Sequence, residues 1–172
     1  SSGGALFNVG YIGDVESIFI DNSSGENGGA LFNKGSIVNL NSDFEANYSV
    51  KGGALFNDEY SVITNISGSF IGNYSKHNTD FVSGGAVYNL GELKLTNTSF
   101  IGNYAYSMGE KALGGAIYNE ANGNVNIVLN NSSKLVFNTI SDDVYNEGTV
   151  NIKGDSVNPT IISMAVVPQT VN

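Results

Sequence analysis

The sequence has no cysteine, no tryptophan and no arginine, and it has a single histidine. Without cysteine the chain can form no disulfide bond, no thiolate metal site and no cysteine nucleophile. Because arginine is absent, only seven lysines balance sixteen acidic residues, and the net charge is -9. Nucleic-acid binding draws on clustered positive charge, so the composition argues against nucleic acid as a partner.

Long apolar runs are also missing. No stretch approaches the roughly 20 apolar residues of a membrane-spanning helix, and no charged-then-apolar signal sequence stands at the start. We therefore expect no membrane span in this chain, and a chain that is trimmed or mature. Charged residues make up only 13% of the sequence, but the 41% of hydrophobic residues recur periodically, which indicates a folded core rather than disorder.

What the sequence contains instead is one motif that occurs six times. The pattern Gly-Gly-Ala, an aliphatic residue, an aromatic residue and Asn begins at Gly3, Gly28, Gly52, Gly84 and Gly114, and a degraded copy occupies residues 141–146. An aromatic residue or Leu three positions before an Asn follows each complete copy: Phe19/Asn22, Phe44/Asn47, Phe70/Asn73, Phe100/Asn103 and Leu135/Asn138. Spacings of 24 to 32 residues are typical of stacked repeats.

Each repeat is predicted to hold three short strands. In the first repeat these are Gly4 to Phe7, Tyr11 to Val15 and Ser17 to Ile20. Alternating apolar residues fit strands, and the recurrent glycine pairs fit helices poorly. The sequence therefore predicts an all-β fold, a parallel β-helix of about six coils over residues 1–155, with each strand paired to its equivalent one coil away.

The last residues, 156–172, lack the motifs and are rich in β-forming residues. We expect an extended strand that caps the final coil, and two alternatives stay open. The segment would otherwise continue into a further domain or add as a strand to another subunit.

Stacking of equivalent residues predicts two asparagine ladders. An inward Asn can satisfy turn backbone groups and bond its neighbours along the stack, which is what a buried polar side chain needs. One ladder comprises Asn8, Asn33, Asn57, Asn89, Asn119 and Asn146, and the other comprises Asn22, Asn47, Asn73, Asn103 and Asn138.

The degraded copy of the motif indicates which face of the motif strand is buried. Asp143 stands at the position of Ala116, and an acidic residue there indicates a position that faces water. By alternation the aromatic residue of the motif also faces outward. This predicts a surface aromatic ladder of Phe7, Phe32, Phe56, Tyr88, Tyr118 and Tyr145. The alternative is a bent strand that tucks the rings partly into a corner.

The connections that lead to the next Gly-Gly pair differ in length. They are short over residues 23–27 and 48–51, and ten residues long over 74–83 and 104–113. We expect the two long loops to protrude side by side. Together they carry a mix of aromatic and polar side chains that is suited to recognising a glycan or a protein. The candidate binding residues are Tyr74, Lys76, His77, Asp80, Phe81, Tyr104, Tyr106, Met108 and Lys111. The alternative is that solenoids tolerate such insertions without consequence.

The paired motifs resemble the repeats of chlamydial polymorphic outer-membrane proteins, over residues 3 to about 153. The form at residues 114–119 is similar to adhesin-like surface proteins of gut bacteria and methanogenic archaea. The resemblance implies a right-handed β-helix displayed at the cell surface, in many cases as an autotransporter passenger, with a role in adhesion and self-association. It is more specific for architecture than for activity.

Catalytic chemistry finds little support in the residues. The adjacent pair Asp142 and Asp143 is typical of a solvated terminal turn, and β-helix polysaccharide lyases typically use an Arg or Lys base. For the single histidine, His77, Asp80 is the sole second ligand in the nearby sequence, which favours a loop residue over a metal site. We expect no catalytic residue, no metal and no cofactor.

These observations predict a non-enzymatic extracellular adhesin or its stalk. It would bind a host or neighbouring-cell glycan or protein through the loops and the solenoid faces. The main alternative is a structural subunit that stacks end to end into an extracellular filament, with residues 159–171 added as a strand to the edge formed by residues 1–8. A weaker alternative is a β-helix polysaccharide lyase.

Overall fold

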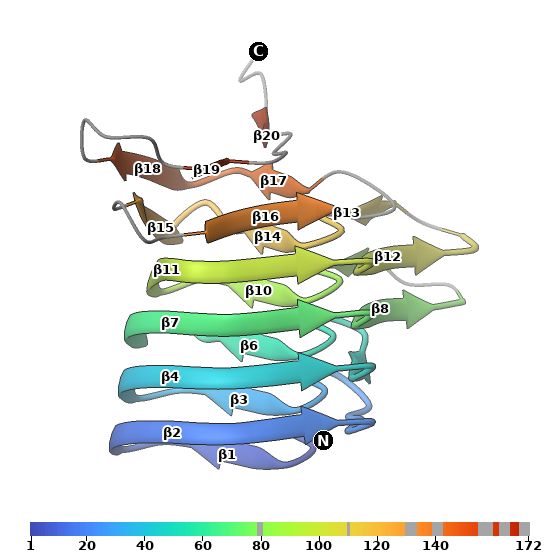
Figure 1. Cartoon of the computed structure of the whole chain (residues 1–172). Coiled ribbons are helices and arrows are strands. Elements are labelled where there is room, and N and C mark those ends of the chain that lie inside the picture. The colour runs from blue at the N-terminus through green and yellow to red at the C-terminus, as the bar shows by residue number, and fades with distance from the viewer. Residues whose placement is uncertain are drawn as a thin grey trace.

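The computed structural model describes residues 1–78, 81–109, 111–129, 134–138, 143–154, 160–161 and 166–168. These residues form strands and turns and contain no helix, so none of them builds a helix able to cross a membrane. The strands stack as successive coils of a β-solenoid (Figure 1). The solenoid has about five turns, close to the six that the repeats predict.

The first sheet contains the short strand of each Gly-Gly-Ala motif. All of its strands are parallel and pair in the order β1-β3-β6-β10-β14-β17-β20. We number the coils by these strands, so that coil 1 begins with β1, coil 2 with β3, coil 3 with β6, coil 4 with β10 and coil 5 with β14. Their bounds are β1 (Leu6–Asn8), β3 (Leu31–Asn33), β6 (Leu55–Asn57), β10 (Val87–Asn89), β14 (Ile117–Asn119), β17 (Val144–Asn146) and β20 (Val166–Pro168).

The second sheet contains the long strand of each coil, in the order β18-β15-β11-β7-β4-β2. Its strands are β2 (Tyr11–Ile20), β4 (Ser36–Glu45), β7 (Val62–Ile71), β11 (Glu92–Ile101), β15 (Asn124–Leu129) and β18 (Thr149–Gly154). In addition, β16 (Lys134–Asn138) pairs with β11, and β19 (Thr160–Ile161) pairs with β16.

Two smaller sheets complete the coils. One contains β5 (Tyr48–Ser49), β8 (Tyr74–His77) and β12 (Tyr104–Ser107), and the other contains β9 (Val82–Ser83) and β13 (Ala112–Leu113). The predicted division of each repeat was therefore wrong in one respect. The two strands expected at Tyr11 to Val15 and Ser17 to Ile20 form the single strand β2, because no turn-forming residue separates them. The third strand of a coil instead follows the Phe-x-x-Asn motif.

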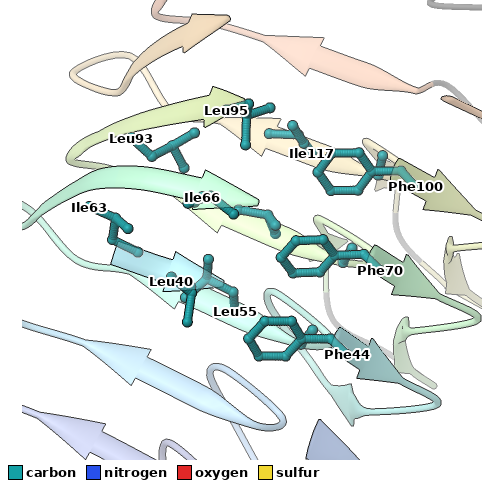
Figure 2. Close-up of a cluster of buried hydrophobic side chains, with 14 of the residues drawn as sticks. Leu40, Phe44, Leu55, Ile63, Ile66, Phe70, Leu93, Leu95, Phe100 and Ile117 are labelled. Carbon is teal, nitrogen blue, oxygen red and sulfur yellow. The ribbon is translucent and has the colours of Figure 1, made fainter. Parts of the chain in front are cut away.

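Equivalent residues lie above one another, as a solenoid requires. Leu6 pairs with Leu31, and Leu31 pairs in turn with Leu55. The interior side chains form one continuous core (Figure 2). Within it the rings of Phe44, Phe70 and Phe100 are fully buried and stack with centroid separations of 4.7 and 4.9 Å. Each such ring contributes about 1.5–3 kcal/mol through burial alone.

The two glycines of each motif have different roles. Gly52 has a φ of 63°, a left-handed conformation that side chains with a Cβ rarely adopt. Gly53 lies against the backbone of the next coil, where an added Cβ would approach the carbonyl oxygen of Gly85 to 2.2 Å. The motif therefore needs its first glycine for conformation and its second for space.

The motif aromatics do not form a surface ladder. Phe32, Phe56, Tyr88, Tyr118 and Tyr145 are only 3–9% exposed, and Phe7 in the first coil is 52% exposed. The argument from Asp143 fails because the alanine positions are buried in coils 2 to 5 and Asp143 itself is 7% exposed. The strand is three residues long and bends at both ends, so strict alternation does not apply. The rings form a second cluster, against which Phe81, Leu90 and Leu113 pack.

The asparagines of the motifs form two hydrogen-bonded rows inside the solenoid. In the first row each Asn Nδ2 donates to the Oδ1 of the equivalent Asn one coil later, over 2.8–2.9 Å from Asn8 through to Asn146. In the second row the same bond joins Asn22, Asn47, Asn73 and Asn103 over 2.9–3.0 Å. The side chain of Asn138 lies outside the described residues. Both rows therefore have a direction along the stack.

Candidate functional site

The strands β8 and β12 project to one side of the stack (Figure 1). Together with β5 they form a small parallel sheet that we call the side ledge. The long connections of coils 3 and 4 build it, because they have room to extend away from the core before returning through β9 and β13. Their pairing is in register, with Tyr104 beside Tyr74 and Tyr106 beside Lys76.

A row of three tyrosines forms the base of the side ledge. The rings of Tyr48 and Tyr74 stack at 5.0 Å, and those of Tyr74 and Tyr104 stack at 5.2 Å with an interplanar angle of 4°. All three rings are half-buried. Tyr48 was absent from the predicted binding residues because its own connection is short. The repeated dipeptide Asn-Tyr, which ends each Phe-x-x-Asn motif from coil 2 to coil 4, is the signal that identifies it.

A recess of about 560 Å³ opens beside these rings. Lys76, His77 and Asn78 line it together with the tyrosines. Burial, with a smaller contribution from Tyr74, raises the pKa of the Tyr104 hydroxyl above its usual value. The recess therefore offers flat aromatic surface, hydroxyl groups, an amide and one cation to a ligand.

The outer surface of the side ledge carries further predicted residues. The ammonium group of Lys76 lies 5.7 Å from the ring centroid of Tyr106, within cation–π range. Tyr106 is 46% exposed and Met108 is 71% exposed. Lys111 is also exposed at the end of the second loop. An exposed aromatic ring and an exposed Met in adjacent loops form a surface suited to contact with a partner.

One of the predicted binding residues lies away from the side ledge. Phe81 turns inward and contacts Tyr118 edge-on, with ring centroids 5.8 Å apart and an interplanar angle of 76°. It therefore packs against the cluster of motif aromatics and helps to shield those rings from water. Asp80 lies outside the described residues.

The motif tyrosines have internal partners. The hydroxyl of Tyr88 donates to Glu120 Oε2 over 2.9 Å, and Tyr118 is hydrogen-bonded to Glu147. In each pair the carboxylate comes from the turn of the next coil. Burial is the main cause that raises the pKa of both tyrosines, and the nearby carboxylates add to it. These rings are thus part of the fold and not of a binding surface.

The side ledge brings together aromatic rings, hydroxyl groups and side-chain nitrogen atoms. Stacked rings hold planar or polyhydroxylated groups, and Lys76 and His77 add hydrogen-bond donors. Over the described ranges, no group of three or more His, Asp and Glu side chains is arranged to hold a metal ion.

Comparison with protein families gives a match at two places. The model of the Chlamydia polymorphic membrane protein repeat matches residues 16–34 and 97–120. Each matched segment contains one Phe-x-x-Asn motif and the Gly-Gly-Ala motif that follows it. In these two segments the chain is similar to polymorphic membrane protein repeats. The resemblance predicted from the sequence is thereby confirmed, together with the solenoid that such repeats form.

The second matched segment contains β12, one strand of the side ledge. It runs from the end of β11 through β12 and β13 to β14, so the longer connection belongs to the repeat that the family model describes. The two segments together cover about a quarter of the chain. No curated protein and no solved structure gives a significant match to the chain.

Proposed function

We propose that this chain is part of a non-enzymatic adhesin, or of its stalk, displayed at the surface of the outer membrane as an autotransporter passenger is. The single observation that carries the proposal is the side ledge, which holds stacked tyrosines and exposed residues on a rigid solenoid built from polymorphic membrane protein repeats. Its partner is a glycan or a protein on a host or neighbouring cell.

The physical basis is the rigidity of the support. Rings that are stacked and half-buried lose little side-chain entropy when a ligand orders them. Tyr74 and Tyr104 are fixed by the pairing of β8 with β12, so the recess keeps its shape without a ligand. The exposed Tyr106 and Met108 add contact area around it.

The test is attachment of beads coated with the chain to cells and to immobilised glycans. The ledge variant changes Lys76, Tyr106 and Met108 to Ser, which removes exposed side chains and leaves the tyrosine row intact. The control variant changes Tyr11, Ile18 and Lys153 to Ser, which are exposed residues of the second sheet. We expect the ledge variant to attach at least tenfold less and the control to attach like the unmodified chain.

The outcomes separate the site from the function. Equal attachment of both variants would show that the side ledge is not the binding surface. Failure of the unmodified chain to attach to any surface would contradict adhesion itself.

The non-enzymatic part of the proposal has its own test. The chain is incubated with acidic polysaccharides in the presence of calcium, and the products are examined for the unsaturated sugar that a lyase forms. We expect none. Any unsaturated product that depends on the chain would identify an enzyme.

A second candidate function is a filament subunit, favoured by the direction of the asparagine rows. Each Asn donates its amide to the following coil: Asn33 Oδ1 accepts from Asn8 Nδ2 and from Gly35 N, and Asn8 Oδ1 accepts from the corresponding Gly10 N. A further copy that donates an amide to Asn8 Oδ1 would extend this row, as in head-to-tail stacking. Concentration-dependent fibres in electron microscopy, lost on deletion of residues 159–172, are expected if this function holds, and a persistent monomer in light scattering contradicts it.

A further inference from the structure

The turns between the first and second sheets differ in length between neighbouring coils. Residues 58–61 form this turn in coil 3 and residues 120–123 form it in coil 5, whereas only Leu90 and Gly91 form it in coil 4. Because β10 pairs with β6 on one side and with β14 on the other, the short turn lies between the two long ones. The long turns are two strand spacings apart, about 10 Å.

This alternation leaves a recess of about 490 Å³. Glu59 and Tyr60 line it from the turn of coil 3, and Asn122 lines it from the turn of coil 5. Gly91 and Glu92 of coil 4 lie between them. The recess precedes β7 and β11 in the chain and the side ledge follows them, so the two sites lie at opposite ends of these strands.

Tyr60 is held in a conformation that does not suit it. Its φ is 63°, in the left-handed region, and the turn is closed by a hydrogen bond of 3.2 Å from Ser61 N to Asp58 O. A glycine would adopt this conformation without strain. Tyr60 is 90% exposed, so burial of its side chain contributes almost nothing to offset the backbone strain. A strained residue with an exposed aromatic ring beside a recess indicates a binding role.

The side chains around the recess define the chemistry of a ligand. The ring of Tyr60 offers a flat face for the apolar face of a sugar ring. The carboxylates of Glu59 and Glu92 accept hydrogen bonds from hydroxyl groups, and the amide of Asn122 both donates and accepts them. The two carboxylates and the net charge of -9 repel an acidic group.

We propose that this recess between the turns binds a hexose residue of a glycan that carries no acidic group. One such ring fits between turns about 10 Å apart, stacked on Tyr60 with its hydroxyls toward Glu59, Glu92 and Asn122. The recess shares no residue with the side ledge, so this site does not depend on the proposed adhesive function of the ledge.

The experiment follows the backbone amide signals of Gly91 and Asn122 by NMR in the isotope-labelled chain. Maltotriose, cellotriose and chitotriose are the neutral probes, trigalacturonate is the acidic probe, and trilysine is a cationic peptide probe. We expect at least one neutral trisaccharide to shift both signals and trigalacturonate to shift neither.

The decisive variant is Tyr60→Gly. It removes the ring and relieves the backbone strain, so the variant unfolds at the same or a higher temperature while the neutral trisaccharide binds at least tenfold more weakly. Tyr11→Ala removes another exposed tyrosine outside the recess and should leave binding unchanged.

Four results would overturn the proposal. They are the absence of shifts with all three neutral probes, a preference for trigalacturonate, a preference for trilysine over the sugars, and unweakened binding by Tyr60→Gly.

Discussion

At the scale of single residues, asparagine is the main polar component of the interior. Asn73 is fully buried and shows why. Its Nδ2 donates to Phe44 O over 2.9 Å and to Asn103 Oδ1 over 3.0 Å. Its Oδ1 accepts from the backbone N and the Nδ2 of Asn47. One side chain therefore joins three consecutive coils.

Replacing this side chain should be costly. Asn73→Ala removes four buried hydrogen bonds, two to Asn47 and one each to Phe44 O and Asn103 Oδ1, and we expect the free energy of unfolding to fall by about 2–4 kcal/mol. Asn39→Ala is the matched control, since Asn39 donates to Asp14 at the surface and its loss should cost less than about 0.5 kcal/mol. Urea unfolding measures both. Equal values for the two variants would mean that the row does not stabilise the fold.

The buried tyrosines make stability depend on pH. The pKa of Tyr88 and that of Tyr118 are raised in the fold, mainly by burial, so the native state keeps both hydroxyls protonated. In the unfolded chain they ionise near pH 10. Their contribution is fully present below about pH 10 and is lost as the pH rises above it, by at most about 1.4 kcal/mol per pH unit for each tyrosine.

The variant Tyr88→Phe tests this dependence. We expect its free energy of unfolding to fall less steeply between about pH 9 and pH 11 than that of the unmodified chain, because one group that favours the unfolded state at high pH is gone. Tyr11→Phe, at an exposed ring, is the control and should follow the unmodified chain. Parallel curves for all three proteins would contradict the assignment.

At the scale of elements, the Gly-Gly pair sets how closely one coil lies on the next. The carbonyl oxygens of Gly85 and Tyr74 would lie 2.2 and 2.4 Å from a Cβ at Gly53. Both are backbone atoms, so neither can move without shifting a strand. The close spacing of the coils at this corner therefore requires a residue without a Cβ atom.

A single methyl group should disrupt this corner. We expect Gly53→Ala to lower the free energy of unfolding by about 3 kcal/mol or more, or to prevent folding. Gly13→Ala is the control, because nothing lies within 4 Å of its added Cβ, and its stability should be unchanged or slightly higher. Thermal unfolding followed by circular dichroism compares them. A folded Gly53→Ala with an unchanged midpoint would show that the corner adapts.

At the scale of the whole molecule, negative charge is poorly compensated. The net charge is -9, and the part of the chain that the structure describes contains two ion pairs, both at the surface. The strand registers place Asp14, Glu16 and Glu45 opposite uncharged residues, but the unbalanced charge of the chain as a whole opposes the compact state.

Salt should therefore stabilise the solenoid. Raising sodium chloride from about 10 mM to about 150 mM shortens the screening length from about 30 Å to about 8 Å. We expect the unfolding temperature to rise by a few degrees, equivalent to about 1 kcal/mol. The double variant Glu16→Gln and Glu45→Gln removes two exposed charges and should show a smaller rise. No rise in either protein would show that charge repulsion is negligible.

The sequence predicted the architecture well and the exposure of the motif residues poorly. Period and motif identity led to parallel coils in register, because stacking equivalent residues is the arrangement that buries every aliphatic residue at once. Alternation assigned the motif aromatics to the surface, and it failed because the loops carrying Phe81 and Leu113 cover them. Tyr48 and Tyr60 were missed, since the residues beside them come from neighbouring coils. Tyr48 stacks on Tyr74, and Tyr60 lines a recess together with Asn122.

The amino-acid sequence alone determined the repeat, the solenoid and the pairing of equivalent residues. These follow from local patterns copied along the chain, and each copy finds its partner one period away. Only the tertiary structure decided which aromatic rings are buried, where the side ledge lies and where the turns enclose a recess. Those features depend on unequal connections lying side by side in space, and burial of a side chain is set by whatever covers it, however distant in the sequence.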